Sequence, residues 1–528
     1  MMKSNKRIFI YLFWFVTLLP AMVFRDFTPN NELRYLSIID EALQNGNVFT
    51  FTNQGEIYAD KPPLHFWLMM LGKVIFGGHH MWYYSLLSVL PAFVILHVMY
   101  KWTLLAYGTN KRGEKEEQND ISSTMMLMTG GLFLVATLIV RMDMLMNMFI
   151  VLSFYSFYKM YVGIDVKRSS ILFPVYTFMA LFSKGPFGLL FPFVSTVAFL
   201  IYEKKIKDFG KYWGWKSFAI IIAGCVIWFA GVYIEGGNDY LYNLTVHQTV
   251  GRGIDSFHHS EPFYYYLISM WYSLFPWSFL VIGVLVAGFV KKKADSSLER
   301  FLAVIVVSTF VILSAVSSKI AIYSLPIIPF MIYLSMLFLR KLNLQSKWLR
   351  VSVAIPAVLF ILVLPAMFFL RNMEDMEFLD NVFIYAGAAV LMVSGIFSIY
   401  MIYGKKDIYK SINTIAVGFM LALFVAGMSL PKVNDYIGWK GMCERASELL
   451  VGVDNGEFFT YHIKRSENMD VYLGKDVVDV SRDDLLNGLN RKGVLMLRTK
   501  RLVDDSDLNN IFIDNEKSVV GPFTIVVL

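Results

Sequence analysis

Residues 351–370 read VSVAIPAVLFILVLPAMFFL, a run of 20 residues without a charged side chain. A helix needs about 20 apolar residues to cross the hydrocarbon core of a bilayer, so this run is long enough to span a membrane. Comparable apolar runs recur along the chain from Ile8 to Leu430. The sequence therefore predicts an all-α polytopic membrane bundle.

The composition of the 528 residues supports a membrane protein, because 56% are hydrophobic and only 17% are charged. Soluble domains carry about 25% charged residues, which excludes a soluble enzyme. The net charge of +7 does not indicate nucleic-acid binding, because the basic residues lie in short loops between apolar runs, where they set membrane orientation. Cys225 lies in an apolar run and Cys443 in a polar region, so no disulfide is expected.

A short apolar piece at 64–77 falls below the roughly 17 residues of a short span, and we interpret it as an interfacial or re-entrant helix. The first apolar run has no small-residue cleavage site at its end, so we interpret it as a retained span and not a signal peptide. The 13 predicted spans are residues 8–24, 81–101, 121–140, 144–163, 170–183, 186–202, 214–235, 263–290, 301–316, 320–339, 351–370, 382–403 and 412–430.

Seven clusters of basic residues between the apolar runs predict the orientation. If 64–77 crossed the membrane, every cluster after the first would lie outside. If it lies along the surface, all seven are cytoplasmic, as the positive-inside rule requires. We therefore expect the amino terminus inside, the carboxyl terminus outside, and outer segments at 25–63, 141–143, 183–185, 236–262, 317–319 and 371–381.

The chain divides into a membrane domain at 1–430, with a first outer loop at 25–80, and a polar domain at 431–528. In the polar domain, β-rich runs alternate with helix-like pieces, which predicts a small α/β unit on the outer side. The membrane domain shows no internal repeat, which weighs slightly against a transporter built from two halves.

Charged residues gather in the first outer loop. Asn31, Glu32 and Arg34 precede an amphipathic stretch, which predicts a helix lying on the membrane surface and ended by Gly46. Asp60-Lys61-Pro62-Pro63 follows directly before the interfacial helix and presents an ammonium group at the height of the lipid headgroups. Ordinary snorkelling of a loop lysine is the alternative interpretation.

Other charged residues stand at the outer ends of predicted spans. Arg141 and Asp143 lie between two apolar runs, where charges are costly unless they face a polar cavity or pair with each other. Lys184 and Lys319 occupy two further outer turns, and Tyr323 lies just inside the membrane. Alone, these positions are equally typical of a turn or of an interfacial aromatic belt.

The polar segment 236–262 holds several groups that bind metals elsewhere, but their spacing matches no ligand pattern, and a solvated loop explains them as well. We therefore predict no metal site. The residues in question are His247, Arg252, Asp255, His258, His259 and Glu261.

On one face of the membrane the chain thus collects several cations and carboxylates. Clustered Lys and Arg bind phosphate well, and cavities between helices hold lipid tails, so we predict an outward-facing site for a phosphate-bearing lipid. The cations are Lys61, Lys184, Arg252 and Lys319, and the carboxylates are Glu32, Asp60 and Asp143.

The order of these pieces resembles the GT-C glycosyltransferases of the protein O-mannosyltransferase group, particularly the bacterial branch of lipid A aminoarabinose transferases. Each motif is weak singly, but their common order over roughly residues 8–340 is specific. The matching pieces are Asn31-Glu32-Leu33-Arg34-Tyr35, Asp60-Lys61-Pro62-Pro63-Leu64, Asp143, Lys184-Gly185-Pro186, Phe275-Pro276-Trp277, and Lys319 with Tyr323 and Pro326.

The resemblance implies a GT-C fold with about 13 spans, a bacterial inner-membrane location and a periplasmic C-terminal domain. It implies that Lys61, Arg252 and Tyr323 hold the phosphate of a polyprenyl carrier, with Asp60 orienting Lys61. Asp143 is then expected in the sugar pocket or at the acceptor.

The resemblance also implies contacts from Lys184, Arg34 and Lys319 to the acceptor or donor. It implies an inverting transfer from a polyprenyl-phosphate sugar to a lipid A-like or glycan acceptor. We expect a monomer that needs no cofactor.

One position departs from the family pattern, because Asn31 stands where the family has an aspartate. An amide cannot accept a proton near neutral pH, so Glu32 or Asp143 is expected to replace it, or the acceptor is already anionic, as a phosphate is. Two alternatives stay open at this point: a non-catalytic protein that binds polyprenyl phosphate, and a lipid or sugar transporter.

Overall fold

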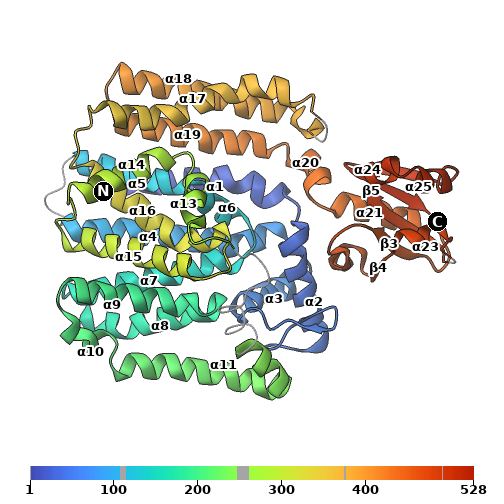
Figure 1. The fold of residues 1–528 in the computed structure, drawn as a ribbon, viewed down its shortest axis with the longest axis horizontal. Coiled ribbons are helices and arrows are strands. Elements are labelled where there is room, and N and C mark those ends of the chain that lie inside the picture. Colours follow the sequence, from blue (N-terminus) through green and yellow to red (C-terminus); the bar gives the residue numbers. More distant parts are fainter. Residues whose placement is uncertain (1, 108–113, 246–260, 374–375, 490) are drawn as a thin grey trace.

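The computed structural model describes residues 2–107, 114–245, 261–373, 376–489 and 491–528. Long helices lie side by side in a bundle, and a smaller unit containing a sheet projects from one end (Figure 1). Each of the 13 predicted spans coincides with one helix or with two consecutive helical pieces. The predicted fold class, a helical membrane bundle with a small C-terminal α/β unit, is confirmed.

The helices of the first half are α1 (Met2–Phe24), α2 (Arg34–Asn45), α3 (Leu64–Phe76), α4 (Met81–Tyr107), α5 (Glu114–Met128), α6 (Gly131–Leu138), α7 (Met142–Tyr161), α8 (Val166–Lys184), α9 (Phe187–Tyr202), α10 (Phe209–Tyr212) and α11 (Trp215–Tyr242). Those of the second half of the bundle are α13 (Tyr265–Ser273), α14 (Ser278–Val290), α15 (Ser297–Ala315), α16 (Ile328–Leu339), α17 (Lys347–Leu370), α18 (Val382–Tyr403) and α19 (Ile408–Gly427). Short turns of other helix types are η1 (Pro29–Leu33), η2 (Ile206–Asp208), η4 (Ala321–Ile327) and η5 (Glu377–Leu379).

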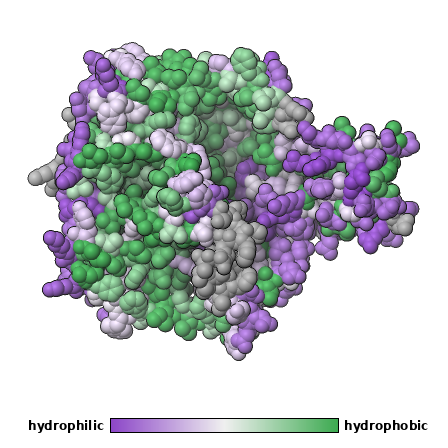
Figure 2. All heavy atoms as spheres, in the orientation of Figure 1, coloured by the Kyte–Doolittle hydropathy of each residue, from purple (hydrophilic) through white to green (hydrophobic). Residues whose placement is uncertain are grey.

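Within the described residues, eight helices are long and apolar enough to cross a membrane, and the pair α5–α6, bent by 58°, makes a ninth if counted as one span. The remaining predicted spans correspond to α7, α8, α9 and the pair α13–α14, which are shorter or more polar. Helix α7 can carry polar residues because most of its surface is buried against other helices. Figure 2 shows the resulting apolar belt, with hydrophilic residues at both ends.

Two of the predicted spans are broken, and their breaks meet. The amide of Gly131, the first residue of α6, donates to the carbonyl of Phe275, between α13 and α14, at 2.7 Å. The indole of Trp277 donates to the Thr129 hydroxyl at 3.0 Å. Backbone NH and CO groups that lose their helical hydrogen bonds inside a membrane need other partners in the protein. Each of these two breaks provides hydrogen-bonding partners for the other.

The first outer segment folds into η1, the amphipathic helix α2, a small hairpin of β1 (Thr52–Asn53) and β2 (Glu56–Ile57), and the short helix α3. Helix α2 ends where the sequence predicts, because Gly46 has φ of 72°, a left-handed conformation that glycine adopts without a steric penalty. Helix α3 has 13 residues, one fewer than the predicted interfacial helix at 64–77.

The C-terminal unit contains a five-stranded sheet of order β4-β3-β5-β7-β6, in which β4, β3 and β5 are parallel and β7 and β6 are antiparallel to their neighbours. Its strands are β3 (Glu457–Tyr461), β4 (Val477–Asp479), β5 (Gly493–Arg498), β6 (Lys517–Val520) and β7 (Phe523–Val527). Its helices are α20 (Leu430–Ile437), α21 (Lys440–Leu450), α22 (Asp470–Leu473), α23 (Arg482–Leu486), α24 (Thr499–Asp504) and α25 (Ser506–Ile511), with the turn η6 (Ser466–Met469).

Candidate functional site

A buried charge cluster joins the outer ends of α7 and α8. Asp143 lies in the first turn of α7, and Lys184 is the last residue of α8. The Lys184 ammonium donates to one oxygen of Asp143, and Arg141 Nε donates to the other at 3.1 Å. The side chains of Asp143 and Lys184 are only 2% and 7% exposed. Such a pair is stable away from water only while both charges remain matched.

The local sequence explains why these charges meet. Helices α7 and α8 are consecutive and pack against each other along their length, so the start of α7 lies beside the end of α8. The chain then turns at Gly185, whose φ of 109° lies in the region that favours glycine, and Pro186 opens α9. The motif Lys184-Gly185-Pro186 therefore places an ammonium group at the junction of two helices.

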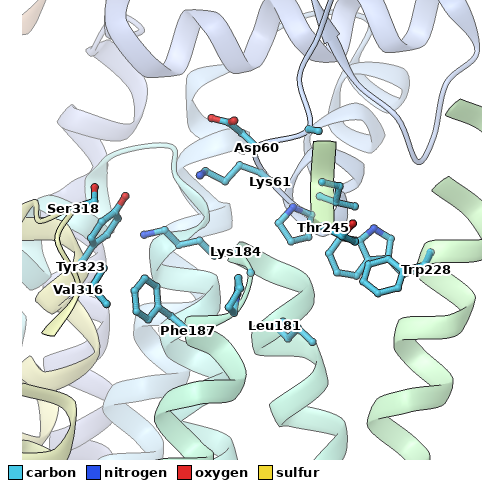
Figure 3. Close-up of a pocket in the computed structure, with 16 residues that line it drawn as sticks. Asp60, Lys61, Leu181, Lys184, Phe187, Trp228, Thr245, Val316, Ser318 and Tyr323 are labelled. Carbon is cyan, nitrogen blue, oxygen red and sulfur yellow. The ribbon is translucent and has the colours of Figure 1, made fainter. Parts of the chain in front are cut away.

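A cavity of about 450 Å³ opens beside this cluster. Figure 3 shows the amino groups of Lys61 and Lys184 directed into the same space as the hydroxyl of Tyr323. The Lys184 nitrogen lies 4.5 Å from the centre of the Tyr323 ring. Asp60 lies next to Lys61 at the rim. Two ammonium groups and a phenol thus face one cavity, an arrangement that suits a phosphate.

The rest of the cavity is largely apolar. Figure 3 shows Trp228 and Leu181 on the wall away from the amino groups, whereas Phe187 lies below Lys184, near Tyr323. Phe229 and Leu244 complete this wall, so the cavity combines a cationic rim with a surface for hydrocarbon.

Glu32, predicted as a catalytic carboxylate, lies elsewhere. Arg25 donates to both of its oxygens, at 2.6 and 2.8 Å. The backbone amides of Thr28 and Val140 donate to the same carboxylate at 2.7 and 2.6 Å. Glu32 is 1% exposed and does not line the cavity. Its geometry is that of a residue that holds η1 against the segment before α7.

Asn31 and Arg34 belong to the same turn. Asn31 is half-buried in η1, and its carbonyl accepts from the Arg34 amide. The Arg34 guanidinium lies 5.2 Å from the centre of the Tyr58 ring and 5.8 Å from that of Tyr35. Neither residue lines the cavity.

Lys319 is placed beside the cavity and not in it. It is 4% exposed, and its ammonium donates to the carbonyl of Glu261 at 2.8 Å. Its neighbour Ser318 does line the cavity. Lys319 thus joins the turn before η4 to the start of the segment leading into α13.

The structure brings together Lys61, Asp60, Lys184 and Tyr323, with Asp143 directly behind Lys184. Arg252, predicted as a further phosphate ligand, lies outside the described residues, as do His247, Asp255, His258 and His259. The site prediction as a whole therefore stays a prediction.

Sequence reasoning did not identify the apolar wall or the role of Arg25. Trp228 and Phe187 resemble any aromatic residue of an apolar helix, so no signal distinguishes them. Arg25 was detectable, because a charged residue at the outer end of the first span and a glutamate seven residues later are candidates for a pair.

No protein-family model matches the chain. Several bacterial proteins are similar to it in sequence. An undecaprenyl phosphate-alpha-4-amino-4-deoxy-L-arabinose arabinosyl transferase of Shewanella sediminis is 24% identical over 370 residues, which are 68% of this chain and 65% of that protein. A protein of the same name from Pseudomonas fluorescens is 23% identical, over 82% of this chain and 75% of that protein.

An uncharacterized protein of Aquifex aeolicus is 25% identical over 60% of each chain. The chain thus spans less than two thirds of the length of the Shewanella and Aquifex proteins. In three dimensions the chain is similar to a crystal structure of ArnT from Cupriavidus metallidurans bound to undecaprenyl phosphate, with a TM-score of 0.75 and 15% identity, covering 100% of this chain and 98% of that one.

The fold is therefore that of the GT-C membrane glycosyltransferases. The chain is similar in sequence to undecaprenyl phosphate-aminoarabinose transferases, and the resemblance predicted from the motifs is confirmed. The relatives are named as arabinosyl transferases, which agrees with the predicted enzyme class.

Proposed function

We propose that this protein transfers a sugar from a polyprenyl-phosphate carrier to a lipid A-like or glycan acceptor at the periplasmic face of the inner membrane. One observation carries the proposal: a single cavity combines two ammonium groups, Lys61 and Lys184, with an apolar wall. A lipid phosphate needs both features, because its headgroup is anionic and its tail is hydrocarbon.

In the proposed reaction an acceptor oxygen attacks the anomeric carbon of the donor sugar. The bond from that carbon to the phosphate oxygen breaks, and the electron pair leaves with the polyprenyl phosphate. Lys61, Lys184 and Tyr323 stabilise the charge that develops on the leaving phosphate, which is the largest electrostatic contribution available to such a site. Attack from the opposite face inverts the anomeric configuration.

The acceptor determines whether a base is needed. A hydroxyl must lose its proton, whereas a phosphate attacks as an anion. Asn31 cannot accept a proton, and all four hydrogen bonds to Glu32 come from donors that hold it in place. These surroundings favour an anionic acceptor such as a lipid A phosphate.

We further propose that the protein acts as a monomer and that transfer needs no cofactor or metal. The amino terminus is then cytoplasmic, and the cavity and the C-terminal unit face the periplasm. Transfer should accordingly persist in an excess of EDTA.

The test uses the full chain in proteoliposomes with undecaprenyl phosphate carrying radiolabelled 4-amino-4-deoxy-L-arabinose, the sugar in the names of the relatives, and lipid A as acceptor. A parallel reaction uses an undecaprenyl-phosphate hexose. We expect label in the acceptor, and we expect Lys61→Ala to reduce transfer by about 10²–10³-fold, the usual loss for one oxyanion ligand. Mass analysis of lipid A and surface glycans in cells with and without the protein identifies the natural product.

The control is Lys410→Ala, because Lys410 lies in a separate apolar groove between α18 and α19 and should leave transfer unchanged. Equal transfer by Lys61→Ala and wild type contradicts the proposal. Binding of undecaprenyl phosphate without transfer of either sugar favours a non-catalytic relative. Movement of labelled donor across the bilayer favours a transporter.

A further inference from the structure

The C-terminal unit packs against the first outer segment. Both contribute to one apolar core, in which Leu33 and Tyr35 of the first segment pack in the same cluster as Trp439 and Phe458 of the C-terminal unit. The same cluster contains Met142, the residue before Asp143. Helix α2 also contacts α22 of the C-terminal unit.

The contact between them centres on Asp26, a buried carboxylate two residues after the end of α1. One of its oxygens accepts from the Lys440 amide at 3.0 Å, and the other accepts from the Tyr472 hydroxyl. The Asp26 amide donates to the side chain of Asn434 at 3.0 Å, which donates in turn to the carbonyl of Phe24 at 2.7 Å. Three separate parts of the C-terminal unit therefore hold residues 24–26.

A second set of contacts holds η1 and α2. Arg465 donates to the carbonyl of Asn30 at 2.7 Å. Asp470 accepts from the Ser37 hydroxyl at 2.8 Å and from Gln54 at 3.1 Å. The first outer segment is thus bound to the C-terminal unit both before and after Asn31.

From this contact, hydrogen bonds continue to the charge cluster. Arg25, the neighbour of Asp26, donates to Glu32 and to the carbonyl of Leu138 at 3.1 Å. Glu32 accepts the Val140 amide at 2.6 Å, and Val140 lies three residues before Asp143. The path from the C-terminal unit to Asp143 therefore combines hydrogen bonds that are buried or partly buried with two backbone links, from Asp26 to Arg25 and from Val140 to Asp143.

We propose that the C-terminal unit positions the charge cluster of the cavity, with Asp26 as the positioning residue through which it acts. This inference rests on the proposed function. Asp26 touches neither the cavity nor the cluster, and it acts through Arg25 and Glu32 on the segment that carries Arg141 and Asp143. Catalytic groups must be held within fractions of an ångström, so a small shift at this contact is expected to slow transfer.

A single glycine offers a sharp test. Gly438 has φ of −115°, which any residue adopts, but a Cβ at this position would overlap the Asp26 carboxylate. Gly438→Ala therefore disturbs the contact at Asp26 without straining its own backbone. The matched control is Gly452→Ala in the same unit, where a Cβ meets only the carbonyl of Leu449 at 3.9 Å, an ordinary contact.

Tyr472→Phe is a milder second variant, because it removes one donor to Asp26 and leaves the Lys440 amide in place. Two measurements are made on each purified full-length protein. The first is the kcat and KM of transfer at a temperature where all variants are folded. The second is hydrogen–deuterium exchange in the peptides that contain residues 28–35 and 138–143.

We expect Gly438→Ala and Tyr472→Phe to increase exchange in both peptides and to lower kcat by roughly 10- to 100-fold, the larger loss belonging to Gly438→Ala. Gly452→Ala should change neither. Unchanged kcat in Tyr472→Phe, or exchange that rises at 28–35 but not at 138–143, overturns the proposal. If Gly438→Ala does not fold, Tyr472→Phe alone decides. If wild type transfers no sugar, the proposed function fails, and the exchange of Val140 still reports whether the coupling exists.

Discussion

Glu32 and Asp143 are both buried carboxylates paired with a cation, yet their surroundings differ. A carboxylate has about four sites that accept hydrogen bonds. Glu32 receives four: two from Arg25 and one each from the amides of Thr28 and Val140. Asp143 receives two within the described residues, from Lys184 and Arg141, and its partner Lys184 faces the cavity.

We propose that this difference separates a structural acid, Glu32, from an acid that can take part in transfer, Asp143. A carboxylate whose acceptor sites are all occupied by hydrogen bonds is fixed in place. A carboxylate beside a cavity that has unoccupied acceptor sites can still accept a hydrogen bond from a sugar hydroxyl. Burial and ion pairing alone do not distinguish the two, because both acids have them. We therefore use the number of occupied acceptor sites to predict which of the two acids is needed for transfer.

The largest expected effect is that of Asp143→Leu. It leaves Lys184 buried without its carboxylate, which costs about 3–5 kcal/mol of stability, and it removes the cluster behind the cavity. We expect transfer to fall by at least about 10²-fold at a temperature where the protein is still folded. Thermal unfolding in detergent and initial transfer rates measure the two effects.

The double variant Asp143→Leu with Lys184→Met separates the effect on stability from the effect on transfer. Replacing both members of a buried pair by apolar residues is often neutral in stability, so Tm should return toward that of wild type while transfer stays lost. Recovery of transfer in the double variant would show that the cluster is only structural.

The next effect is that of Glu32→Gln, which tests the other side of the comparison. The amide keeps the shape, but its NH₂ group faces donors, so at least one of the four hydrogen bonds is lost and a buried donor stays unsatisfied, at a cost of about 1–3 kcal/mol or more. We expect a lower Tm and a smaller loss of transfer than in Asp143→Leu. A catalytic Glu32 would show the reverse order, with transfer abolished and Tm unchanged.

Much of the fold was predictable because its signals are local. The apolar runs at 351–370 and 382–403 appear as α17 and α18 with nearly the same ends. The break in 263–290 was not predicted, because a proline inside an apolar run does not reveal whether the helix bends or stops. Among the predicted site residues, Lys61 and Lys184 line the same cavity.

The surroundings of Glu32 could not be predicted in the same way. Its partners Arg25 and Val140 lie 7 and 108 residues away in sequence, and only the folded chain shows that both reach it. Sequence patterns identify which residue types are present at the outer face. They do not show which lone pairs are already occupied.

A smaller effect is expected from Asn31→Asp, which restores the carboxylate of the family pattern. A general base accelerates proton removal by about 10²–10⁴-fold when it is ideally placed. Asn31 is half-buried and does not line the cavity, so we expect a gain of about tenfold at most with a hydroxyl acceptor. With a phosphate acceptor the rate should not change. Parallel assays with the two acceptor classes, and Asn30→Asp as a neighbouring control, provide the comparison; a gain only with phosphate would contradict the anionic-acceptor hypothesis.

The smallest effect is expected at His65, a fully buried residue of α3 whose ring nitrogens make no hydrogen bond within the described residues. Burial lowers the pKa of His65 to about 4, against the opposing influence of the Asp143 charge. The folded protein therefore keeps this ring neutral, while the unfolded chain takes up a proton as the pH falls below about 6.5, so stability should decrease between about pH 6.5 and 4. His65→Leu removes the titrating group and should flatten that part of the Tm-against-pH profile.

The same substitution should also raise Tm slightly at neutral pH, by the equivalent of about 1 kcal/mol, because an unsatisfied buried polar group disappears. If His65→Leu raises the KM for the donor and leaves Tm unchanged, His65 contacts the substrate. The part of the site with unoccupied hydrogen-bonding groups then includes α3 as well as Asp143.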